Sequence, residues 1–352
     1  MNPLLPGFGL IGSSAVLNAA FAVPLKLRRR FEWENTWLLA MFCAMIAFPL
    51  IAASFLLPHW LVAIASVGTS TLLTVAFFGF LWGIGSVTFA IGIDVIGISL
   101  GYAIIMGVVT VVGATIPMFR KWSHIPGDAR TVILLGIGVC LAGVAVCGRA
   151  GVLRERRTNS ASRALEVSSA AEKTAARAFL VGLAWCVFAG ILSAGNNLGF
   201  DFAERVAVEA ERLGAHPIFA SLGRFIPVYW GGYLAVLIWC GSRALNKGTW
   251  RKFGGSDAPR DAGLAALMGL LHFLSQLTYG MGAYYVGRLG TTVGFAVMVA
   301  TSLILANSFG FMTGEWKMAT KHSKHVLYLG LAILITAVLV LAYGNSLVSG
   351  RG

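Results

Sequence analysis

The chain has 352 residues, of which 57% are hydrophobic and 12% are charged, and its formal net charge is +13. A soluble globular protein carries about 25% charged residues, so this composition excludes an ordinary water-soluble domain. The basic residues lie in short segments between apolar runs, as membrane topology signals do, which argues against a nucleic-acid-binding protein. Five cysteines fall inside apolar runs without metal-ligand spacing, so we expect neither a disulfide framework, nor a metal site, nor a cofactor.

Ten continuous apolar runs follow one another along the chain. Each is close to the length of about 20 residues that crosses a bilayer as a helix, and the absence of alternation argues against a membrane β-barrel. We therefore predict an all-α integral membrane protein with ten transmembrane helices. The predicted helices are 4–25, 36–57, 72–93, 96–117, 131–148, 178–199, 219–240, 262–286, 290–313 and 326–345. The first is expected to be retained, since no Lys or Arg precedes it as in a signal peptide.

The distribution of positive charge predicts the orientation of the chain. Of the 27 Lys and Arg residues, 19 lie in the odd-numbered connections between the predicted helices. Cytoplasmic connections of membrane proteins are enriched in Lys and Arg. The odd connections are therefore expected in the cytoplasm and both termini in the periplasm, across a bacterial inner membrane.

The basic segment 149–177 is predicted to link two halves, 1–148 and 178–352, of five helices each. An odd number of helices per half inserts the second half upside down relative to the first, so this organisation predicts a 5+5 inverted repeat. The segment 200–214 is predicted as a short amphipathic helix that stops at Gly214 and either lies at the outer interface or extends the sixth helix.

Two short matches between the halves favour the repeat. Ser14 and Asn18 correspond to Ser193 and Asn197 at a constant offset of 179 residues. The glycine pattern 97–101 also corresponds to 290–294 at an offset of 193. In transporters built from inverted repeats, two bundles rock about a site near the middle of the membrane.

Motifs spread over about 300 residues resemble those of the L-rhamnose–proton symporter (RhaT) family, within the drug/metabolite transporter superfamily. They include Leu10-Ile11-Gly12, Trp33-Glu34, Trp82-Gly83-Ile84-Gly85, Arg149-Ala150-Gly151, Ser193-Ala194-Gly195, Leu213-Gly214 and Glu315-Trp316. The resemblance implies the drug/metabolite transporter fold and proton-coupled uptake of a sugar by alternating access. The chain departs from the family pattern at Asp94, His272 and Arg224, so the resemblance bears more directly on the fold than on the substrate.

A sugar site needs amides, hydroxyls and aromatic faces within apolar helices. The candidate substrate-binding residues are Asn18, Trp82, Asn196, Asn197, His272, Gln276 and Tyr279. Residues 272, 276 and 279 share one face of the eighth predicted helix. Each candidate also has a structural alternative: the amides and the polar face as contacts between helices, and Trp82 as a packing or interface residue.

Proton coupling requires a group that titrates inside the protein. All 14 carboxylates lie in loops or at the ends of predicted helices, so the candidates are His272, Asp94 and Glu315. Arg224, inside the seventh helix, is a gating or charge-pairing candidate that either reaches the interface, pairs with Asp201 or Glu204, or contacts solute. The resemblance favours symport, whereas the residues alone leave a facilitator open.

Two alternatives to a sugar symporter stay open at this stage. The first is a transporter or facilitator of an amino acid, drug, nucleotide sugar or other small metabolite with the same fold. The second is an intramembrane transferase, which should show clustered carboxylates, a His/Asp pair or a metal motif. The sequence shows none of these patterns, so a transporter is favoured over an enzyme. The expected partners are a small solute, protons and the lipid bilayer, and the sequence does not indicate an oligomeric state.

Overall fold

The computed structural model describes residues 4–21, 23–96, 98–160, 169–312, 314, 316–317 and 319–349. Within these residues the chain is helical and contains no strand. Nine helical stretches of the described chain are long and apolar enough to cross a membrane. The protein is therefore a multi-pass, all-α integral membrane protein, as its composition predicts.

One of the nine stretches, Ala258–Met312, contains two of the ten predicted helices. They are α12 (Ala258–Val286) and α13 (Phe295–Met312), separated by the 3-10 turn η5 (Gly287–Leu289) and the π-helical turn η6 (Gly290–Gly294). Gly287 has a φ of +78°, which favours glycine. The remaining eight stretches match the other predicted helices, and the inverted relation between the halves stays a prediction.

The chain forms two compact units that interleave in the sequence. Unit 1 consists of Met1–Ile84 and Gly195–Met298, and unit 2 consists of Gly85–Ala194 and Val299–Gly352. Each unit therefore takes helices from both sides of the basic segment 149–177. The predicted halves 1–148 and 178–352 concern an internal repeat and stay a prediction.

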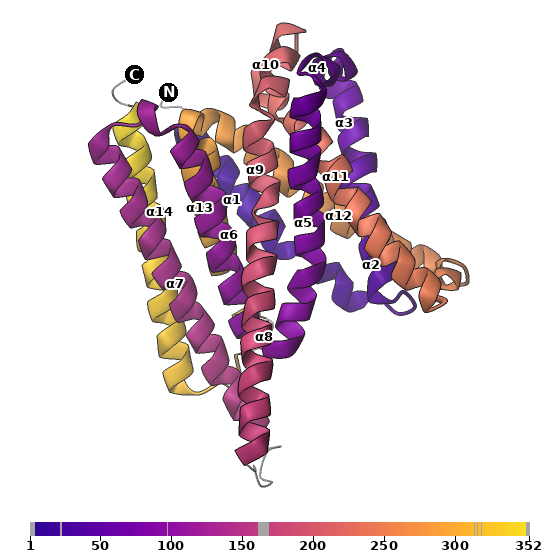
Figure 1. The fold of residues 1–352 in the computed structure, drawn as a ribbon, viewed down its shortest axis with the longest axis vertical. Helices are drawn as coiled ribbons and strands as arrows, with labels where there is room; N and C mark the ends of the chain where they lie inside the picture. Colours follow the sequence, from indigo (N-terminus) through magenta and orange to yellow (C-terminus); the bar gives the residue numbers. More distant parts are fainter. Residues whose placement is uncertain are drawn as a thin grey trace. The chain divides into compact units, whose positions relative to one another are not determined.

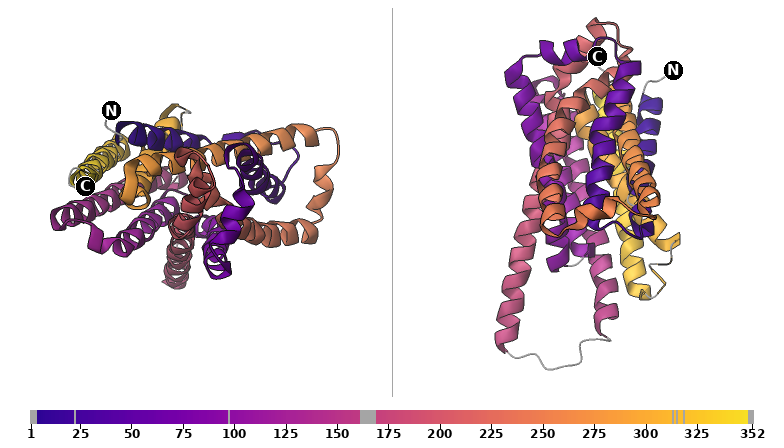
Figure 2. Two further views of the ribbon diagram at one scale, coloured as in Figure 1. Left: turned by 90° about the horizontal axis from the view of Figure 1, so that it is seen from above. Right: turned by 90° about the vertical axis from the view of Figure 1, so that its right-hand side faces the viewer.

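Unit 1 is organised around α12, and the view from above in Figure 2 shows the indigo α1 lying against the orange α12. Two glycines permit this approach, because a Cβ atom on Gly282 would lie 2.9 Å from the carbonyl oxygen of Gly7. The α-helices of unit 1 are labelled in Figure 1. The elements of unit 1 are α1 (Leu4–Ala20), η1 (Val23–Leu27), α2 (Trp33–Phe42), η2 (Cys43–Ala47), α3 (Phe48–Leu56), α4 (Trp60–Ser66), the first part of α5 (Thr69–Ile96), α9 (Gly195–Phe202), α10 (Glu204–Arg212), α11 (Pro217–Asn246), η4 (Thr249–Phe253), α12, η5, η6 and the start of α13.

The predicted amphipathic segment 200–214 contains the amphipathic helix α10, while its first residues, 200–202, belong to α9. Its apolar residues Val206 and Ala210 are fully buried in a core that includes Leu57, Ile64 and Leu222 of the neighbouring elements. The stop falls where expected, since the chain turns at Gly214 with a φ of +94°. This core holds α10 against α4 and α11 at one end of unit 1.

Asp261 anchors the connection between α1 and α2 to the beginning of α12. Its carboxylate is 1% exposed and accepts hydrogen bonds from the main-chain N–H groups of Arg29 (3.1 Å), Arg30 (2.7 Å) and Phe31 (2.8 Å). We call this arrangement the Asp261 clamp. Three donors on one carboxylate stabilise its charged form, which offsets the cost of burying it.

A second group of polar contacts lies beside the clamp. Glu34 is 2% exposed and lies 3.3 Å from Lys247 and 3.3 Å from the hydroxyl of Thr249. Glu32 forms an ion pair with Lys252, and the hydrogen bond and charge of this lysine lower the pKa of the Glu32 carboxyl. These pairs join the start of α2 to the connection that follows α11.

Unit 2 is built on α7 and α14, which run antiparallel and lie side by side in Figure 1. Gly136 and Gly143 of α7 allow close contact with Leu341 and Leu334 of α14. The elements of unit 2 are the rest of α5, α6 (Ile98–Arg120), η3 (Trp122–His124), α7 (Gly127–Ser160), α8 (Ser169–Ser193), the rest of α13 and α14 (Lys321–Ser349). Both ends of the basic segment 149–177 are thus helical continuations of α7 and α8.

Candidate functional site

The predicted substrate-binding residues all belong to unit 1. Trp82 lies in α5, Asn196 and Asn197 begin α9, and Asn18 is half-buried in α1. His272, Gln276 and Tyr279, on the predicted polar face of α12, are 7%, 5% and 1% exposed. The structure brings Trp82, the two α9 asparagines and the three α12 residues into two connected groups of contacts.

The first group is an aromatic box around His272. The indole of Trp82 stacks on the imidazole with ring centroids 5.9 Å apart and planes 15° apart. Phe21 approaches the same imidazole with a centroid distance of 5.5 Å. Trp37 lies behind Phe21 at 6.4 Å, and Tyr229 lies behind Trp82 at 6.2 Å. Residues from α2, α5, α11 and α12 and the end of the first helical segment thus enclose one histidine.

Several buried polar atoms in this part of unit 1 have no hydrogen-bond partner among the described residues. They are Nδ1 and Nε2 of His272, Nε1 of Trp37, the hydroxyl of Tyr229, Oδ1 of Asn196 and Oγ of Ser221. Buried polar groups are normally paired, and each unpaired group costs about 1–3 kcal/mol. Buried polar atoms without partners, some of them beside aromatic rings, are expected of a binding site for a polar solute.

The second group is a hydrogen-bonded chain that joins α12, α9 and η6. The hydroxyl of Tyr279 donates to Oδ1 of Asn197 at 2.6 Å, and Nδ2 of Asn197 donates to the carbonyl oxygen of Thr291 at 2.7 Å. The hydroxyl of Thr291 in turn donates to Oδ1 of Asp201 at 2.7 Å. Nδ2 of Asn196, the residue before Asn197, lies 3.4 Å from Oε1 of Gln276 and so links the chain to the box.

Asp201 is the functional candidate that sequence reasoning named only as a partner for Arg224. It lies near the end of α9, as expected for a carboxylate, but it is fully buried within the candidate membrane span Leu180–Arg212. The apolar segment continues through α9 beyond the predicted helix end at 199, which carries Asp201 into the interior. The sequence contains a signal that links Asp201 to the candidate site, because Asn197 and Asp201 lie four residues apart and therefore on one helical face.

Arg224 of α11 packs against α9. Its Nε donates to the carbonyl oxygen of Phe200 at 2.8 Å, and its guanidinium carbon lies 3.8 Å from the centre of the Phe200 ring. The second contact has the geometry of a cation–π interaction. Arg224 therefore contacts the residue next to Asp201, and its predicted role in gating stays a prediction.

Ser275 shows that the structural alternative holds for part of the α12 face. Its hydroxyl donates to the carbonyl oxygen of Ser14 at 2.9 Å and lies 3.2 Å from the hydroxyl of the same serine. Ser275 therefore fastens α12 to α1, as polar residues between membrane helices do.

Two predicted proton-coupling residues lie outside what the structure describes, namely the side chain of Asp94 and the whole of Glu315. Both stay sequence predictions. Among the described residues, no group of three or more His, Cys, Asp or Glu side chains is placed to hold a metal ion.

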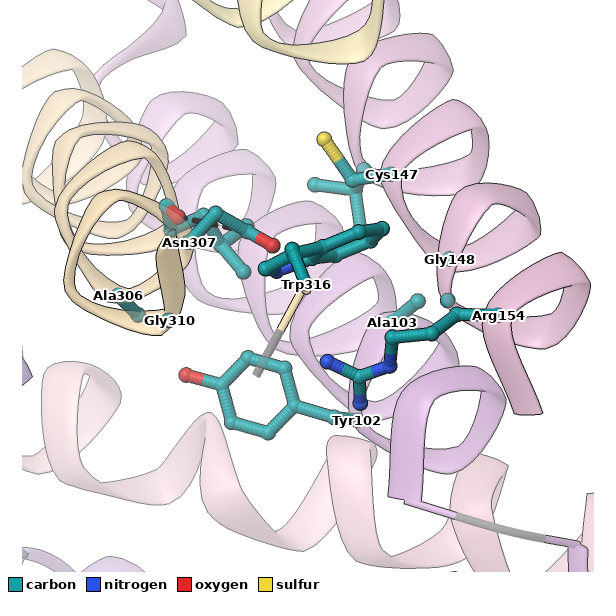
Figure 3. A pocket seen from close by; sticks show the side chains of 12 residues that line it. Tyr102, Ala103, Cys147, Gly148, Arg154, Ala306, Asn307, Gly310 and Trp316 are labelled. Atoms are coloured by element: carbon teal, nitrogen blue, oxygen red, sulfur yellow. Dashed lines mark hydrogen bonds between the residues drawn. The ribbon is translucent and has the colours of Figure 1, made fainter. Parts of the chain in front are cut away.

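Unit 2 contains a cavity of about 210 Å³, shown in Figure 3, that none of the predicted binding residues lines. The guanidinium of Arg154 lies 4.9 Å from the ring centre of Trp316, and both line the cavity with Tyr102 and Asn307. Gly151 of the Arg149-Ala150-Gly151 motif also lines it, so this motif meets Trp316 here.

The membrane-spanning helices of this protein enclose a group of polar and aromatic side chains. This arrangement is that of a polytopic membrane transport protein. The family model for the L-rhamnose-proton symport protein (RhaT) matches residues 7–346, and the chain belongs to this family. The family consists of proton-coupled transporters and not of enzymes.

Relatives match the chain over nearly its full length. An L-rhamnose-proton symporter from Cronobacter sakazakii is 28% identical over 95% of both chains. One from Pectobacterium atrosepticum is 27% identical over 97% of this chain and 98% of its own. One from Escherichia coli (strain SMS-3-5 / SECEC) is 26% identical over 95% of this chain and 96% of its own.

Proposed function

We propose that the protein takes up L-rhamnose, or a closely related deoxysugar, together with protons across a bacterial inner membrane. The family and the printed names of the relatives support this substrate. The observation that carries the proposal is the aromatic box, where His272 and its neighbours leave buried donors and acceptors unpaired between apolar ring faces.

The chemistry of the box suits a deoxysugar. Such a sugar combines hydroxyl groups with an apolar ring face and a methyl group. Trp82 and Phe21 supply apolar surfaces, while His272 and Asn196 supply polar atoms that pair with hydroxyls. A neutral imidazole offers one donor and one acceptor, and an amide offers both functions as well.

The remaining predicted residues are assigned supporting roles. Gln276 orients Asn196, and the bond from Tyr279 fixes Asn197 beside it. Asn18, on the helix packed against α12, is proposed to contact the sugar from the α1 side. Arg224 holds the end of α9 through Phe200.

Alternating access is the proposed mode of transport, and the path of the chain supports it. The chain leaves unit 1 after Ile84 and re-enters it at Gly195. Trp82 lies two residues before the first crossing, and Asn196 is the second residue after the return to unit 1. Movement of these connections would therefore act on Trp82 of the box or on Asn196 beside it.

The positive charge of the odd connections supports an orientation with these connections in the cytoplasm and both termini in the periplasm. On sequence grounds alone, His272 is a candidate for carrying the proton, because the unperturbed pKa of a histidine lies near 6.5. Asp94 and Glu315 are proposed alternatives on sequence grounds.

Uptake of labelled L-rhamnose into proteoliposomes, with and without a pH gradient that is acidic outside, tests the proposal. We expect saturable uptake that exceeds equilibrium only when the gradient is present. Unlabelled deoxysugars and unrelated metabolites, added as competitors, define the cargo class. An absence of saturable sugar flux would contradict the substrate, and flux indifferent to the gradient would contradict symport.

A further inference from the structure

We infer that Asp201 is the residue that binds and releases the transported proton, an assignment that rests on the proposed symport. Three carboxylates in the described part of the chain are buried: Glu34, Asp201 and Asp261. Ionisable residues inside a membrane protein are costly and generally mark a proton or ion pathway unless a structural role explains them.

Structural roles explain two of the three. Asp261 is held by three main-chain N–H groups in the clamp, and Glu34 lies within ion-pair distance of Lys247 and Arg243. The contacts of both carboxylates join the connections at one end of unit 1.

Asp201 alone among them belongs to the hydrogen-bonded chain that reaches the box. Its carboxylate accepts from the hydroxyl of Thr291, whose carbonyl oxygen accepts from Asn197. Asn197 is bonded to Tyr279 of the α12 face. Two hydrogen bonds therefore separate the carboxylate from an amide beside the proposed sugar site.

The charged and titratable groups around Asp201 favour a carboxylate that starts ionised. From α11, Arg224 contacts the adjacent Phe200, and α12 contributes Tyr279 through the hydrogen-bonded chain. Glu204 and Arg205 of α10 are exposed. Residues 69–84 of α5 and the η6 turn contain no titratable side chain. A nearby cation favours the charged form of a carboxylate, so a proton once bound can also be released.

The proton step involves one bond. A proton from the outer water forms an O–H bond with the ionised Asp201 carboxylate and makes a neutral carboxylic acid. On opening to the cytoplasm, that bond breaks, the proton returns to water and the carboxylate is restored. Each cycle moves one positive charge inward with one neutral sugar.

The position of Thr291 explains how the proton and the sugar are coupled. Thr291 lies in η6, and π-helical turns frequently occur at functional sites. Protonation of Asp201 weakens the hydrogen bond that it accepts from the Thr291 hydroxyl, since a charged acceptor binds a donor more strongly than a neutral one. The same residue holds Asn197 through its carbonyl oxygen, so the proton alters the positioning of the site.

The test compares Asp201→Asn with Glu204→Gln, a matched loss of an exposed carboxylate from the neighbouring helix. Both variants are reconstituted with the wild type, and two assays use labelled L-rhamnose. One is exchange of internal for external sugar without a gradient, and the other is accumulation driven by a pH gradient. Asp201→Asn should retain exchange and lose accumulation at least tenfold, whereas Glu204→Gln should match the wild type in both assays.

The outcomes separate the two proposals. A wild type that does not transport L-rhamnose contradicts the proposed function. The assignment of the proton to Asp201 is contradicted if the Asp201→Asn protein accumulates L-rhamnose as strongly as the wild type. If folded Asp201→Asn loses exchange as well, Asp201→Glu decides: restored accumulation supports a proton role, and continued loss overturns it.

A second variant keeps the assignment testable if Asp201→Asn does not fold. Thr291→Val leaves the carboxylate but removes its hydroxyl donor. Without this donor, the charged form of the Asp201 carboxylate is less stable relative to its protonated form. The pH at which uptake is half-maximal should therefore rise by about one unit. An unchanged pH profile would overturn the assignment.

Discussion

His272 combines two properties that rarely occur together in a protein interior. Its ring is packed between Trp82 and Phe21, and neither of its ring nitrogens has a hydrogen-bond partner in the described structure. An unpaired buried polar group lowers stability, so the arrangement favours binding of a solute at some expense of stability. Such exchange of stability for function is common at binding sites.

Replacement of His272 by Phe tests this interpretation. The aromatic stacking should survive, while the unpaired nitrogens are removed, so the free energy of unfolding should rise by about 1 kcal/mol. The affinity for L-rhamnose should fall about tenfold or more, which corresponds to one lost hydrogen bond of about 1.4 kcal/mol. Thermal unfolding in detergent and uptake kinetics measure the two effects. Replacement of the exposed His322 by Phe serves as the control. A His272→Phe protein that transports L-rhamnose normally would show that His272 does not belong to the site.

At the scale of elements, close approach of helix backbones determines where Trp82 lies. Gly79 and Gly83 of α5 face Val228 and Gly232 of α11, and a Cβ atom on Gly79 would collide with the carbonyl oxygen of Val228. Small residues at helix contacts allow such approach in membranes. The position of Trp82 against His272 therefore depends on a glycine one turn earlier in α5.

Substitution of Gly79 by Ala should separate α5 from α11. Overpacking of this kind costs about 1–3 kcal/mol, and we expect a lower unfolding temperature together with reduced uptake. Gly263→Ala in α12 is the control, because no neighbouring atom lies within 4 Å of its added Cβ. There the gain in helix propensity should leave stability equal or slightly higher. Equal unfolding temperatures for the two variants would show that the contact is less tight than the structure indicates.

The Asp261 clamp makes a second prediction about elements. Asp261→Asn removes the charge that accepts three main-chain N–H groups, and the unfolding free energy should fall by about 2 kcal/mol. Asp257→Asn alters an exposed carboxylate four residues earlier and should change it by no more than about 0.5 kcal/mol. Thermal unfolding of the purified variants measures the difference. If Asp261→Asn leaves the unfolding free energy unchanged, other contacts hold the connection between α1 and α2.

At the scale of the whole molecule, contacts between connections agree with the charge pattern. The connection after α1 and the connection after α11 meet through Glu32 with Lys252 and through Arg30 with the Lys252 carbonyl. In the numbering of the ten predicted helices, these are the first and the seventh connections. They lie at the same end of unit 1, as the positive-inside rule requires for two odd-numbered connections. These contacts do not by themselves say which compartment that end faces.

Reporter fusions determine the compartment. We expect alkaline phosphatase, which is active only in the periplasm, to be active when fused after Gly352 and inactive when fused at Gly248 in the connection after α11. Green fluorescent protein at the same two positions should give the opposite pattern. The reverse pattern would place the odd connections in the periplasm and overturn the orientation.

Local hydrophobicity along the sequence was sufficient to predict the fold class and the membrane helices of this protein. Runs of about 20 apolar residues are sufficient to identify membrane helices, and helical periodicity identified the face of α12 that carries His272 and Tyr279. The family motifs likewise depend on residue order along the chain, and their resemblance was confirmed by the full-length match.

Only the tertiary structure decided which of these residues meet. Trp82 and His272 stack although they lie far apart in the sequence, because glycine contacts between α5 and α11 place one helix against another. Asp201 lies near a helix end in the sequence, yet the packing of α9 against α11 and η6 buries it fully. Burial and pairing depend on neighbours from distant segments, so a pattern confined to one segment predicts a helix but not the partners of its side chains.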